Sequence, residues 1–239
     1  MAVVLLSGTR NASSWAMRAW LALTEAGVDF NEVVVDIRRP QRYAMLGRVR
    51  ELSPPGQVPV LIVDGQLVFD SLAIMEFAND VSGGRLLPSD AVRRAQARAL
   101  VAWQHAGLSN LCGRVTFESA FYPYKANLSL AEQRECGPVL RWLESLLRTS
   151  SGPFLFGDVS LADLSLAPTI IRLVRHGLDL TGHPRGAEWM CAVMARDAVR
   201  IWMNDADGLP HVWLHDDYVP AGQEQSLQPT VPAATSVRL

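Results

Sequence analysis

The chain has 239 residues, of which 49% are hydrophobic and 19% are charged, and its formal net charge at pH 7 is −2. These values are typical of a globular protein that folds as one large domain or two small ones. A charge so close to zero gives no long-range attraction to nucleic acid or to an anionic membrane, so we expect neither as a partner. No apolar run approaches the ~20 residues of a membrane span, and the apolar start lacks the features of a signal peptide. We therefore expect a cytoplasmic protein.

The three cysteines, Cys112, Cys136 and Cys191, are isolated from one another in the sequence. None belongs to a CxxC pair or to a spacing that is typical of metal ligands. We expect each of them to be a small buried apolar side chain, and we predict no metal site.

Residues 1–81 predict short apolar strands that alternate with helices. Ala2 to Ser7 predicts a strand buried on both faces, a serine-capped helix follows up to Gly27, and Phe30 to Ile37 predicts the next strand. A strand, helix, strand order indicates a parallel pair with a right-handed crossover. Arg38 to Leu52 is polar and basic, and it predicts a short irregular helix.

The stretch GQVPVLIVDGQLVFDSLAIMEF, from Gly56 to Phe77, contains the strongest local signals of the chain. Two apolar runs, Val60 to Val63 and Gln66 to Phe69, are joined by the dipeptide Asp-Gly. This link predicts a β-hairpin with a type I′ turn.

Residues on both sides of this hairpin predict a binding site. Asp70 and Ser71 stand where the next helix begins, and the N-terminus of a helix holds a carboxylate well. Pro59 at the mouth of the first strand makes the Val58-Pro59 bond a candidate for the cis form, which would turn the backbone of Val58 toward a peptide ligand. An ordinary hairpin and helix with a trans bond explains the local pattern equally well.

The later part of the chain changes character. Residues 82–90, SGGRLLPSD, predict a linker, residues 91–216 predict an all-helical domain, and residues 217–239 predict a flexible tail. Apolar residues recur at helical spacing in Ala91 to Phe121, Leu130 to Leu147 and Leu161 to Val174, and more weakly in Ala187 to Ala195 and Ala198 to Met203.

The segment VSLADL, from Val159 to Leu164, predicts a capping box at the start of a helix. The Ser160 side chain caps the Asp163 N–H, the Asp163 carboxylate accepts from the Ser160 N–H, and Val159 packs on Leu164 as a hydrophobic staple. We assign Ser160 and Asp163 to folding.

These motifs resemble the cytosolic glutathione transferases. The sequences V-P-V-L, D-G and D-S-L-A-I-M-E-F are similar to the glutathione-binding half of their thioredoxin-like domain, and PFLFGDVSLADLSLAP resembles their buried capping box. The resemblance is to a serine-type bacterial member, with some similarity to the zeta and tau classes. It implies an α/β thioredoxin-like N-terminal domain of order βαβαββα, residues 1–81, followed by the all-α domain.

The resemblance also implies roles for particular residues in holding glutathione. In this family the proline is cis, the residue before it pairs with the cysteinyl backbone of glutathione, and an acidic residue and a serine hold the γ-glutamyl end. Carried over, these residues are Val58, Pro59, Asp70 and Ser71. Gln57 stands where relatives place a side chain that reaches the glycine carboxylate. Weaker candidates for that carboxylate are Arg39 and Gln41.

The sulfur of a peptide bound along Val58 would lie near the start of the first helix. A thiol is a poor nucleophile until it ionises, so a catalyst needs a donor that favours the thiolate. The segment S-S-W-A-M-R-A-W-L-A-L resembles the serine-type members, and an ungapped alignment places Ser13 at their catalytic serine. Ser14 and Asn11 are alternatives, and the competing interpretation is that both serines only cap the helix.

Other residues bear on the kind of chemistry. No tyrosine precedes Tyr43 and no cysteine precedes Cys112, so the tyrosine-type and cysteine-type reactions lack their usual residue. The zeta class, which isomerises maleylacetoacetate, carries a cysteine two residues after its serine, and Trp15 stands there in this chain. That difference counts against isomerase activity of this type.

The pocket for the second substrate is expected on the first helix of the all-helical domain. His105, Asn110 and Arg114 have spacings that bring them toward one side of a helix, with Leu111 among them. A lone histidine is more often structural, and core or subunit contacts are the competing interpretation of this helix.

The predicted function is glutathione transfer to a small, hydrophobic electrophile in a homodimer, with glutathione as co-substrate. Dehalogenation and isomerisation are variants of that reaction. A non-catalytic glutathione-binding or protein-docking module on the same fold is the alternative from another class. A thiol reductase is disfavoured because no cysteine lies near residue 13. The sequence does not specify the acceptor.

Overall fold

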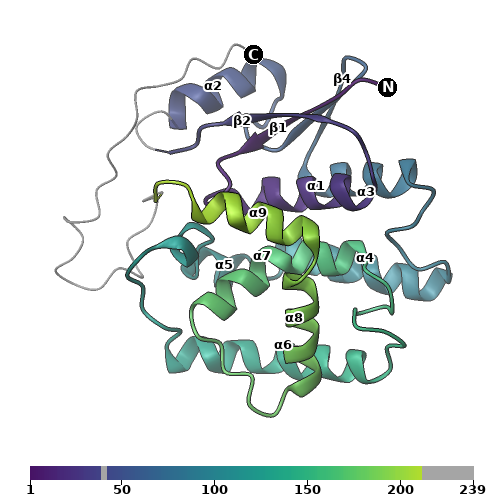
Figure 1. Ribbon diagram of the computed structural model, residues 1–239, viewed down its shortest axis with the longest axis vertical. Coiled ribbons are helices and arrows are strands. Elements are labelled where there is room, and N and C mark those ends of the chain that lie inside the picture. Colours follow the sequence, from purple (N-terminus) through teal and green to yellow (C-terminus); the bar gives the residue numbers. More distant parts are fainter. Residues whose placement is uncertain (39–41, 212–239) are drawn as a thin grey trace.

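The computed structural model describes residues 1–38 and 42–211. The predicted tail, residues 217–239, and the candidates Arg39 and Gln41 therefore lie outside the described residues. Figure 1 shows a layer that contains the sheet, set against a layer built of helices.

The N-terminal part has the predicted order βαβαββα. Its sheet has four strands in the order β2-β1-β3-β4, with β1 parallel to β2 and antiparallel to β3. The predicted parallel pair is therefore confirmed. The bounds are β1 Val3–Gly8, α1 Ser14–Glu25, β2 Asn31–Val35, α2 Arg42–Leu52, β3 Val60–Val63, β4 Gln66–Phe69 and α3 Ser71–Val81.

The hairpin has the predicted bounds, and its turn has the predicted geometry. Asp64 has φ 46° and Gly65 has φ 83°, so both central residues have the positive φ that a type I′ turn requires. Val63 pairs with Gln66 across the turn. The Asp-Gly dipeptide thus fixes the position of Asp70 directly after β4.

The two faces of the sheet are covered by different helices. Leu5 and Leu61, which pair across β1 and β3, belong to the core that α1 and α3 share with the helical layer. Leu6 and Val60, the next pair, belong to a smaller core that includes Val49 of α2. Side chains of a strand alternate between faces, and this alternation separates the two cores.

Helix α2 differs from the prediction. It is a regular helix over Arg42–Leu52, where the sequence predicts a short irregular one. Val49 is fully buried, and Met45 and Leu46 pack partly against the same core. Three apolar residues at helical spacing are enough to hold one edge of the helix on the sheet, while the rest of it remains polar.

The later part is helical, and its predicted runs are confirmed with one correction. The run from Ala91 to Phe121 is not continuous, because it divides into α4, α5 and a short 3-10 helix. Gly107 is the C-cap of α4, and a Cβ there would lie 2.5 Å from Trp103 Cδ1. The bounds are α4 Ala91–Ala106, α5 Ser109–Arg114, η1 Glu118–Phe121, α6 Leu130–Arg148, α7 Leu161–Arg175, α8 Pro184–Met194 and α9 Asp197–Asp207. The division into domains at residues 82–90 stays a prediction.

The capping box at the start of α7 is confirmed. One carboxylate oxygen of Asp163 accepts from Ser160 N at 2.9 Å and from Ser160 Oγ at 2.7 Å. The other accepts from Leu155 N at 3.0 Å and from Trp189 Nε1 at 2.8 Å. Asp163 is completely buried, and it ties the start of α7 to α8 and to the segment that precedes α7.

The prediction that all three cysteines are buried is wrong for Cys191. Cys136 is buried, Cys112 is half-buried and Cys191 is exposed. Helix α8 turns Trp189, Met190 and Val193 inward, so Cys191 lies on its outer side. Periodicity places the helix, but a cysteine by itself does not say which side it occupies.

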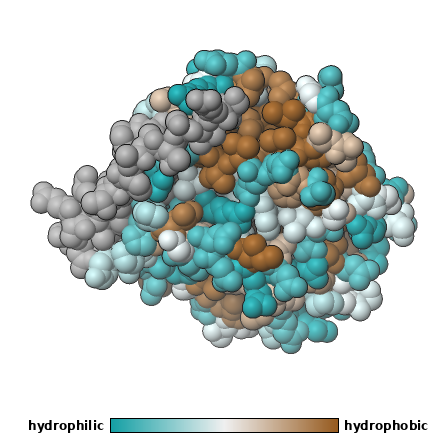
Figure 2. All heavy atoms as spheres, turned by 45° about the horizontal axis from the view of Figure 1, so that its top comes forward, coloured by the Kyte–Doolittle hydropathy of each residue, from teal (hydrophilic) through white to brown (hydrophobic). Residues whose placement is uncertain are grey.

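The surface combines polar and apolar areas. Figure 2 shows hydrophilic side chains over much of the visible face. Hydrophobic side chains gather in the upper half of that view, and the sheet also lies in the upper half of Figure 1. Two strand residues, Val34 and Phe69, are each 42% exposed. Within the described ranges, no helix combines the length and the apolar character needed to cross a membrane.

Candidate functional site

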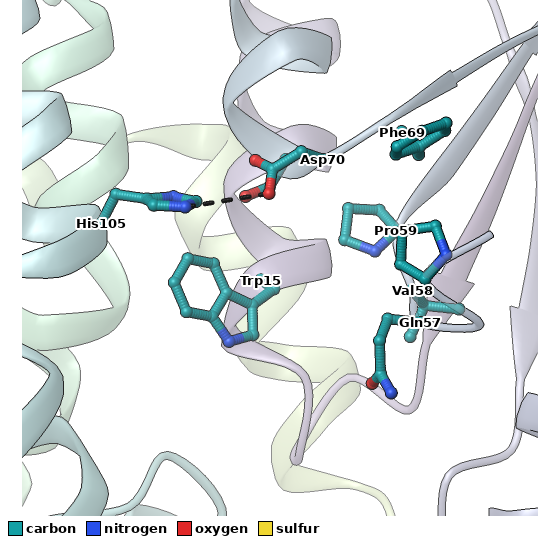
Figure 3. Close-up of a pocket in the computed structure, with 9 residues that line it drawn as sticks. Trp15, Gln57, Val58, Pro59, Phe69, Asp70 and His105 are labelled. Atoms are coloured by element: carbon teal, nitrogen blue, oxygen red, sulfur yellow. Dashed lines mark ion pairs between the residues drawn. The ribbon is translucent and has the colours of Figure 1, made fainter. Parts of the chain in front are cut away.

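A cavity of about 330 Å³ lies where the hairpin, α3, α1 and α4 meet. All five predicted glutathione residues line it, together with His105. Figure 3 shows His105 on one side of the cavity and Gln57, Val58 and Pro59 on the other, with Trp15 between them. The sequence analysis did not place Trp15, Pro55 or Phe69 there. The lining residues are Trp15, Pro55, Gln57, Val58, Pro59, Phe69, Asp70, Ser71 and His105.

The peptide bond between Val58 and Pro59 is cis, as the sequence suggested. The ladders of β3 with β1 and β4 begin at Val60, so Val58 lies outside the strand pairing. Its backbone N–H and C=O are therefore placed at the wall of the cavity without a role in the sheet.

Asp70 is the N-cap of α3. Its Oδ1 accepts from Leu72 N at 2.8 Å, and its Oδ2 lies 3.8 Å from His105 Nε2. Its φ of 70° lies in the left-handed region, which costs a non-glycine residue about 1–3 kcal/mol. Ser71, the first residue of α3, is buried at the same corner of the cavity. Strain of this kind is concentrated at ligand-binding positions.

Ser13 is the N-cap of α1, and its Oγ accepts from Ala16 N at 3.3 Å. This bond uses Oγ as an acceptor, so the hydroxyl hydrogen remains able to donate to a ligand. A Cβ at Gly8 would lie 2.8 Å from Ser13 Oγ and 3.0 Å from Val58 Cγ2. The absence of a side chain at Gly8 thus lets Ser13 pack beside Val58.

The two alternatives to Ser13 are held by the C-terminal half of the chain. Ser14 Oγ accepts from Arg172 Nη2 at 2.9 Å, and Asn11 Nδ2 donates to the Pro210 carbonyl at 2.9 Å. None of the three candidates, Ser13 included, is among the residues that line the cavity, but Ser13 lies beside Val58, which does line it. The geometry therefore favours Ser13 among the three candidates.

The comparisons with known proteins agree with this geometry. Residues 12–81 match the family model "Glutathione S-transferase, N-terminal domain", and residues 131–215 match "Glutathione S-transferase, C-terminal domain". The chain belongs to the glutathione S-transferase family. The family and fold predicted from the sequence are confirmed, and an enzyme of the glutathione transferase class is supported.

Relatives of this transferase cover most of its length. A Caenorhabditis elegans protein named "Probable maleylacetoacetate isomerase" is 34% identical over 189 residues, which are 76% of this chain and 83% of the relative. The Dianthus caryophyllus "Glutathione S-transferase 1" is 33% identical over 178 residues, 72% of this chain and 79% of the relative. The crystal structure of a Burkholderia glutathione transferase homologue with bound glutathione has a TM-score of 0.65 and 27% identity, covering 86% of this chain and 98% of that one.

Of the three residues predicted for the acceptor pocket, the transferase structure brings only His105 to the cavity. The His105 ring lies 5.0 Å from the Trp15 ring, centre to centre, in an edge-on contact. Asn110 is exposed, and Arg114 forms an ion pair with Glu135. Because α4 ends at Ala106, the helical spacing from His105 is not continued into α5.

The transferase also buries two arginines that the sequence analysis did not assign to the site. Arg18 is 3% exposed and Arg172 is 5% exposed. Burial, and then the charge of Arg172, lower the pKa of Arg18 to about 9. The Arg18 guanidinium lies 4.1 Å from the centre of the ring of Trp15, which lines the cavity.

Among residues 1–38 and 42–211, no group of three or more His, Cys, Asp or Glu side chains is arranged to hold a metal ion. The polar groups of the cavity are instead amide, hydroxyl, imidazole and carboxylate groups. Such a set suits a peptide ligand that is held by hydrogen bonds and charge.

Proposed function

We propose that this transferase binds glutathione in the cavity and ionises its thiol for attack on a small, apolar electrophile. The observation that carries the proposal is the position of Ser13. It lies at the N-terminus of α1 and packs beside Val58, the residue proposed to hold the cysteinyl unit. The bound glutathione in the Burkholderia homologue supports the choice of ligand.

The proposed binding mode uses each lining residue for one part of the tripeptide. The N–H and C=O of Val58 pair with the cysteinyl backbone. Asp70 binds the ammonium of the γ-glutamyl unit, while Ser71 and the N-terminus of α3 bind its carboxylate. Gln57, on the opposite wall, reaches the glycine carboxylate. The left-handed backbone of Asp70 supports this, because strain there aims a carboxylate into the cavity.

The chemistry follows from the hydrogen-bond donor at the sulfur. A hydrogen bond to a charged sulfur contributes about 1.5–3 kcal/mol, which lowers the pKa of the thiol by about 1–2. The thiol proton goes to solvent, and the thiolate forms a bond to the electrophilic carbon while the leaving group departs with the electron pair. Trp15 and Phe69, which line the cavity, give it apolar surface that suits an apolar acceptor.

The test is a titration of bound glutathione, in which the ultraviolet absorbance of the thiolate is followed against pH. We expect the wild type to lower the pKa of the bound thiol by at least about 1, and Ser13→Ala to abolish that change while it still binds glutathione. Ser129→Ala is the matched control, because Ser129 caps α6 in the same way but lies outside the cavity. Binding with an unchanged thiol pKa in the wild type would identify a non-catalytic binding module instead.

A second candidate function is glutathione-dependent isomerisation, and the names of the relatives favour it. There the thiolate adds to one carbon of a conjugated double bond, the resulting single bond rotates, and the C–S bond breaks as the double bond re-forms. Trp15, where the zeta class has cysteine, counts against it. The two reactions are distinguished by product analysis, because transfer consumes glutathione and isomerisation returns it.

We also propose a homodimer and a cytoplasmic location, as is usual for this family. An apolar groove of about 450 Å³ between α4 and α6, lined by Trp103, Val139 and Trp142, supports the dimer. Trp142 is 50% exposed, and exposed apolar area of this kind is typical of subunit contacts. Light scattering after size-exclusion chromatography tests the homodimer, and a monomeric mass would refute it.

A further inference from the structure

Two buried guanidinium groups lie behind the first turn of α1. Arg18 and Arg172 are nine-tenths buried or more, and neither has a carboxylate within ion-pair distance among the described residues. An unpaired buried charge is costly, and other buried or half-buried arginines of this chain, such as Arg10 with Glu32 and Arg196 with Glu25, do have a carboxylate partner. Within the described residues, neither arginine therefore forms an ion pair with a carboxylate, and the nearest influence of this kind is the more distant charge of Asp70 on Arg18.

Their hydrogen bonds leave part of each guanidinium unsatisfied. Arg172 donates from Nη2 to Ser14 Oγ at 2.9 Å and from Nη1 to Cys112 Sγ at 3.5 Å, while Arg18 donates from Nε to the Ser165 carbonyl at 3.1 Å. Arg172 Nε and Arg18 Nη1 are buried without a hydrogen-bond partner in the described part of the chain. Buried donors are rarely left in this state unless a ligand or water completes them.

The place of these charges links them to the proposed site of the sulfur. Ser14 is the first residue of α1 and follows Ser13, and Arg18 is one turn further along the helix. The N–H groups of Ala16 and Met17 are bound by Ser13, which leaves those of Ser14 and Trp15 without a partner in the described ranges. The positive end of α1 and two positive side chains thus lie close together, next to Ser13. Burial and repulsion from Arg172 lower the pKa of Arg18 to about 9, as expected when two positive charges are held close together.

We propose that Arg172 is a positioning residue for the reacting sulfur. Its hydrogen bond to Ser14 fixes the first turn of α1, and its charge, with that of Arg18, is neutralised by the thiolate of glutathione. The thiol proton leaves to solvent, so the bound sulfur becomes the missing counter-ion. The inference rests on the proposed glutathione site, and it adds a residue 159 positions from Ser13 to that site's machinery.

The sulfur is a better counter-ion than the carboxylates of the same ligand. Those carboxylates are assigned to Ser71 of α3 and to Gln57, which precedes the hairpin, whereas Ser14 and Arg18 belong to α1. A unit charge about 8 Å away in a medium of effective dielectric constant about 20 changes a pKa by about 1.5, so the loss of Arg172 is expected to have a measurable effect.

The experiment is the thiolate titration of bound glutathione in the wild type, Arg172→Met and Arg172→Lys. We expect Arg172→Met to raise the pKa of the bound thiol by about 1, which is a tenfold loss of thiolate below the midpoint, and Arg172→Lys to stay closer to the wild type. Arg196→Met is the matched control, because Arg196 also ties the C-terminal half to α1, at Glu25, the last residue of the helix. It should leave the titration unchanged.

A second ligand separates charge from structure. S-methylglutathione has no ionisable thiol, so its affinity should change less than about twofold in Arg172→Met while the affinity for glutathione falls at neutral pH. If both ligands lose affinity equally, Arg172 is only structural and the inference is wrong. If the variant keeps the wild-type titration, the inference is also wrong, although the transferase function stands.

Two further results complete the test. Ser14→Ala keeps the charge of Arg172 but removes its hydrogen bond to Ser14. We expect the pKa of the bound thiol to rise less in this variant than in Arg172→Met. If Arg172→Met does not fold, Ser14→Ala decides, and an unchanged titration in that variant refutes the inference. If the wild type itself does not lower the thiol pKa, the proposed function and this inference fail together.

Discussion

Asp70 and His105 face each other across the cavity, with Asp70 Oδ2 3.8 Å from His105 Nε2 (Figure 3). Asp70 comes from the hairpin and α3, and His105 comes from the last turn of α4. The pair therefore connects the two halves of the chain at the point where we place the γ-glutamyl end of glutathione. The carboxylate has two tasks there, since it caps α3 and also faces the cavity.

Asp70→Asn separates these two tasks. Asn is as good an N-cap as Asp and tolerates a left-handed backbone, so the free energy of unfolding should change by less than about 0.5 kcal/mol. The affinity for glutathione, measured by calorimetry, should fall about 10-fold to 100-fold because a charge-assisted hydrogen bond is lost. Asp90→Asn is the control, because Asp90 caps α4 in the same way outside the cavity. An unchanged affinity in Asp70→Asn would remove Asp70 from the site.

Gly8→Ala tests the packing of Ser13 on Val58. The added Cβ would lie 2.6 Å from Ser13 Cβ and 3.0 Å from Val58 Cγ2, so both residues must move. We expect a loss of about 1–3 kcal/mol in the free energy of unfolding. We also expect the variant to lower the thiol pKa of bound glutathione by less than the wild type does.

The control for that substitution is Gly47→Ala in α2. A Cβ at Gly47 meets no atom within 4 Å, and alanine is favoured over glycine in a helix by about 0.5–1 kcal/mol. Stability should rise and the thiol titration should stay as in the wild type. Equal effects of the two substitutions on the titration would contradict the proposed contact.

The sequence predicted those parts of the site that depend on short segments. The Asp64-Gly65 turn predicts the exact bounds of both hairpin strands, because only a few dipeptides adopt two positive φ values. The places of Asp70 and Val58 followed directly from the turn and the strand. Helix α2 was less clear, because its apolar edge is too narrow to stand out from a polar segment.

The remaining contacts of the site join residues that are far apart in the chain. Ser14 and Arg172 are separated by 158 positions, and nothing in either local segment indicates their hydrogen bond. The end of α4 before Gly107 is not predicted by the sequence, because apolar periodicity continues across it. Local patterns therefore predict the residues around Val58 and Asp70 that line the cavity. The contacts of Arg18 and Arg172 with α1 can be seen only in the structure.

The three thiols should react with iodoacetamide at very different rates. Burial raises the pKa of Cys136 to about 11, and the side chain is 2% exposed, whereas Cys191 is exposed. Only the thiolate reacts, so at pH 8 the native protein should be labelled at Cys191 first and at Cys136 last. Raising the pH toward 11 should speed the labelling of Cys136. Mass spectrometry of the labelled peptides measures this, with protein unfolded in urea as the reference in which the three rates converge.

Asp163 should be among the most costly positions to change. Its carboxylate accepts from two backbone N–H groups, one hydroxyl and one indole, all of them buried. Asp163→Ala leaves these donors without an acceptor, so we expect a loss of about 3–5 kcal/mol in the free energy of unfolding by urea. Asp163→Asn should also destabilise, because its NH2 group would face donors. Asp197→Ala is the control, since that side chain is 91% exposed and should cost less than about 0.5 kcal/mol. A loss below about 1 kcal/mol in Asp163→Ala would show that the capping box is dispensable for the fold.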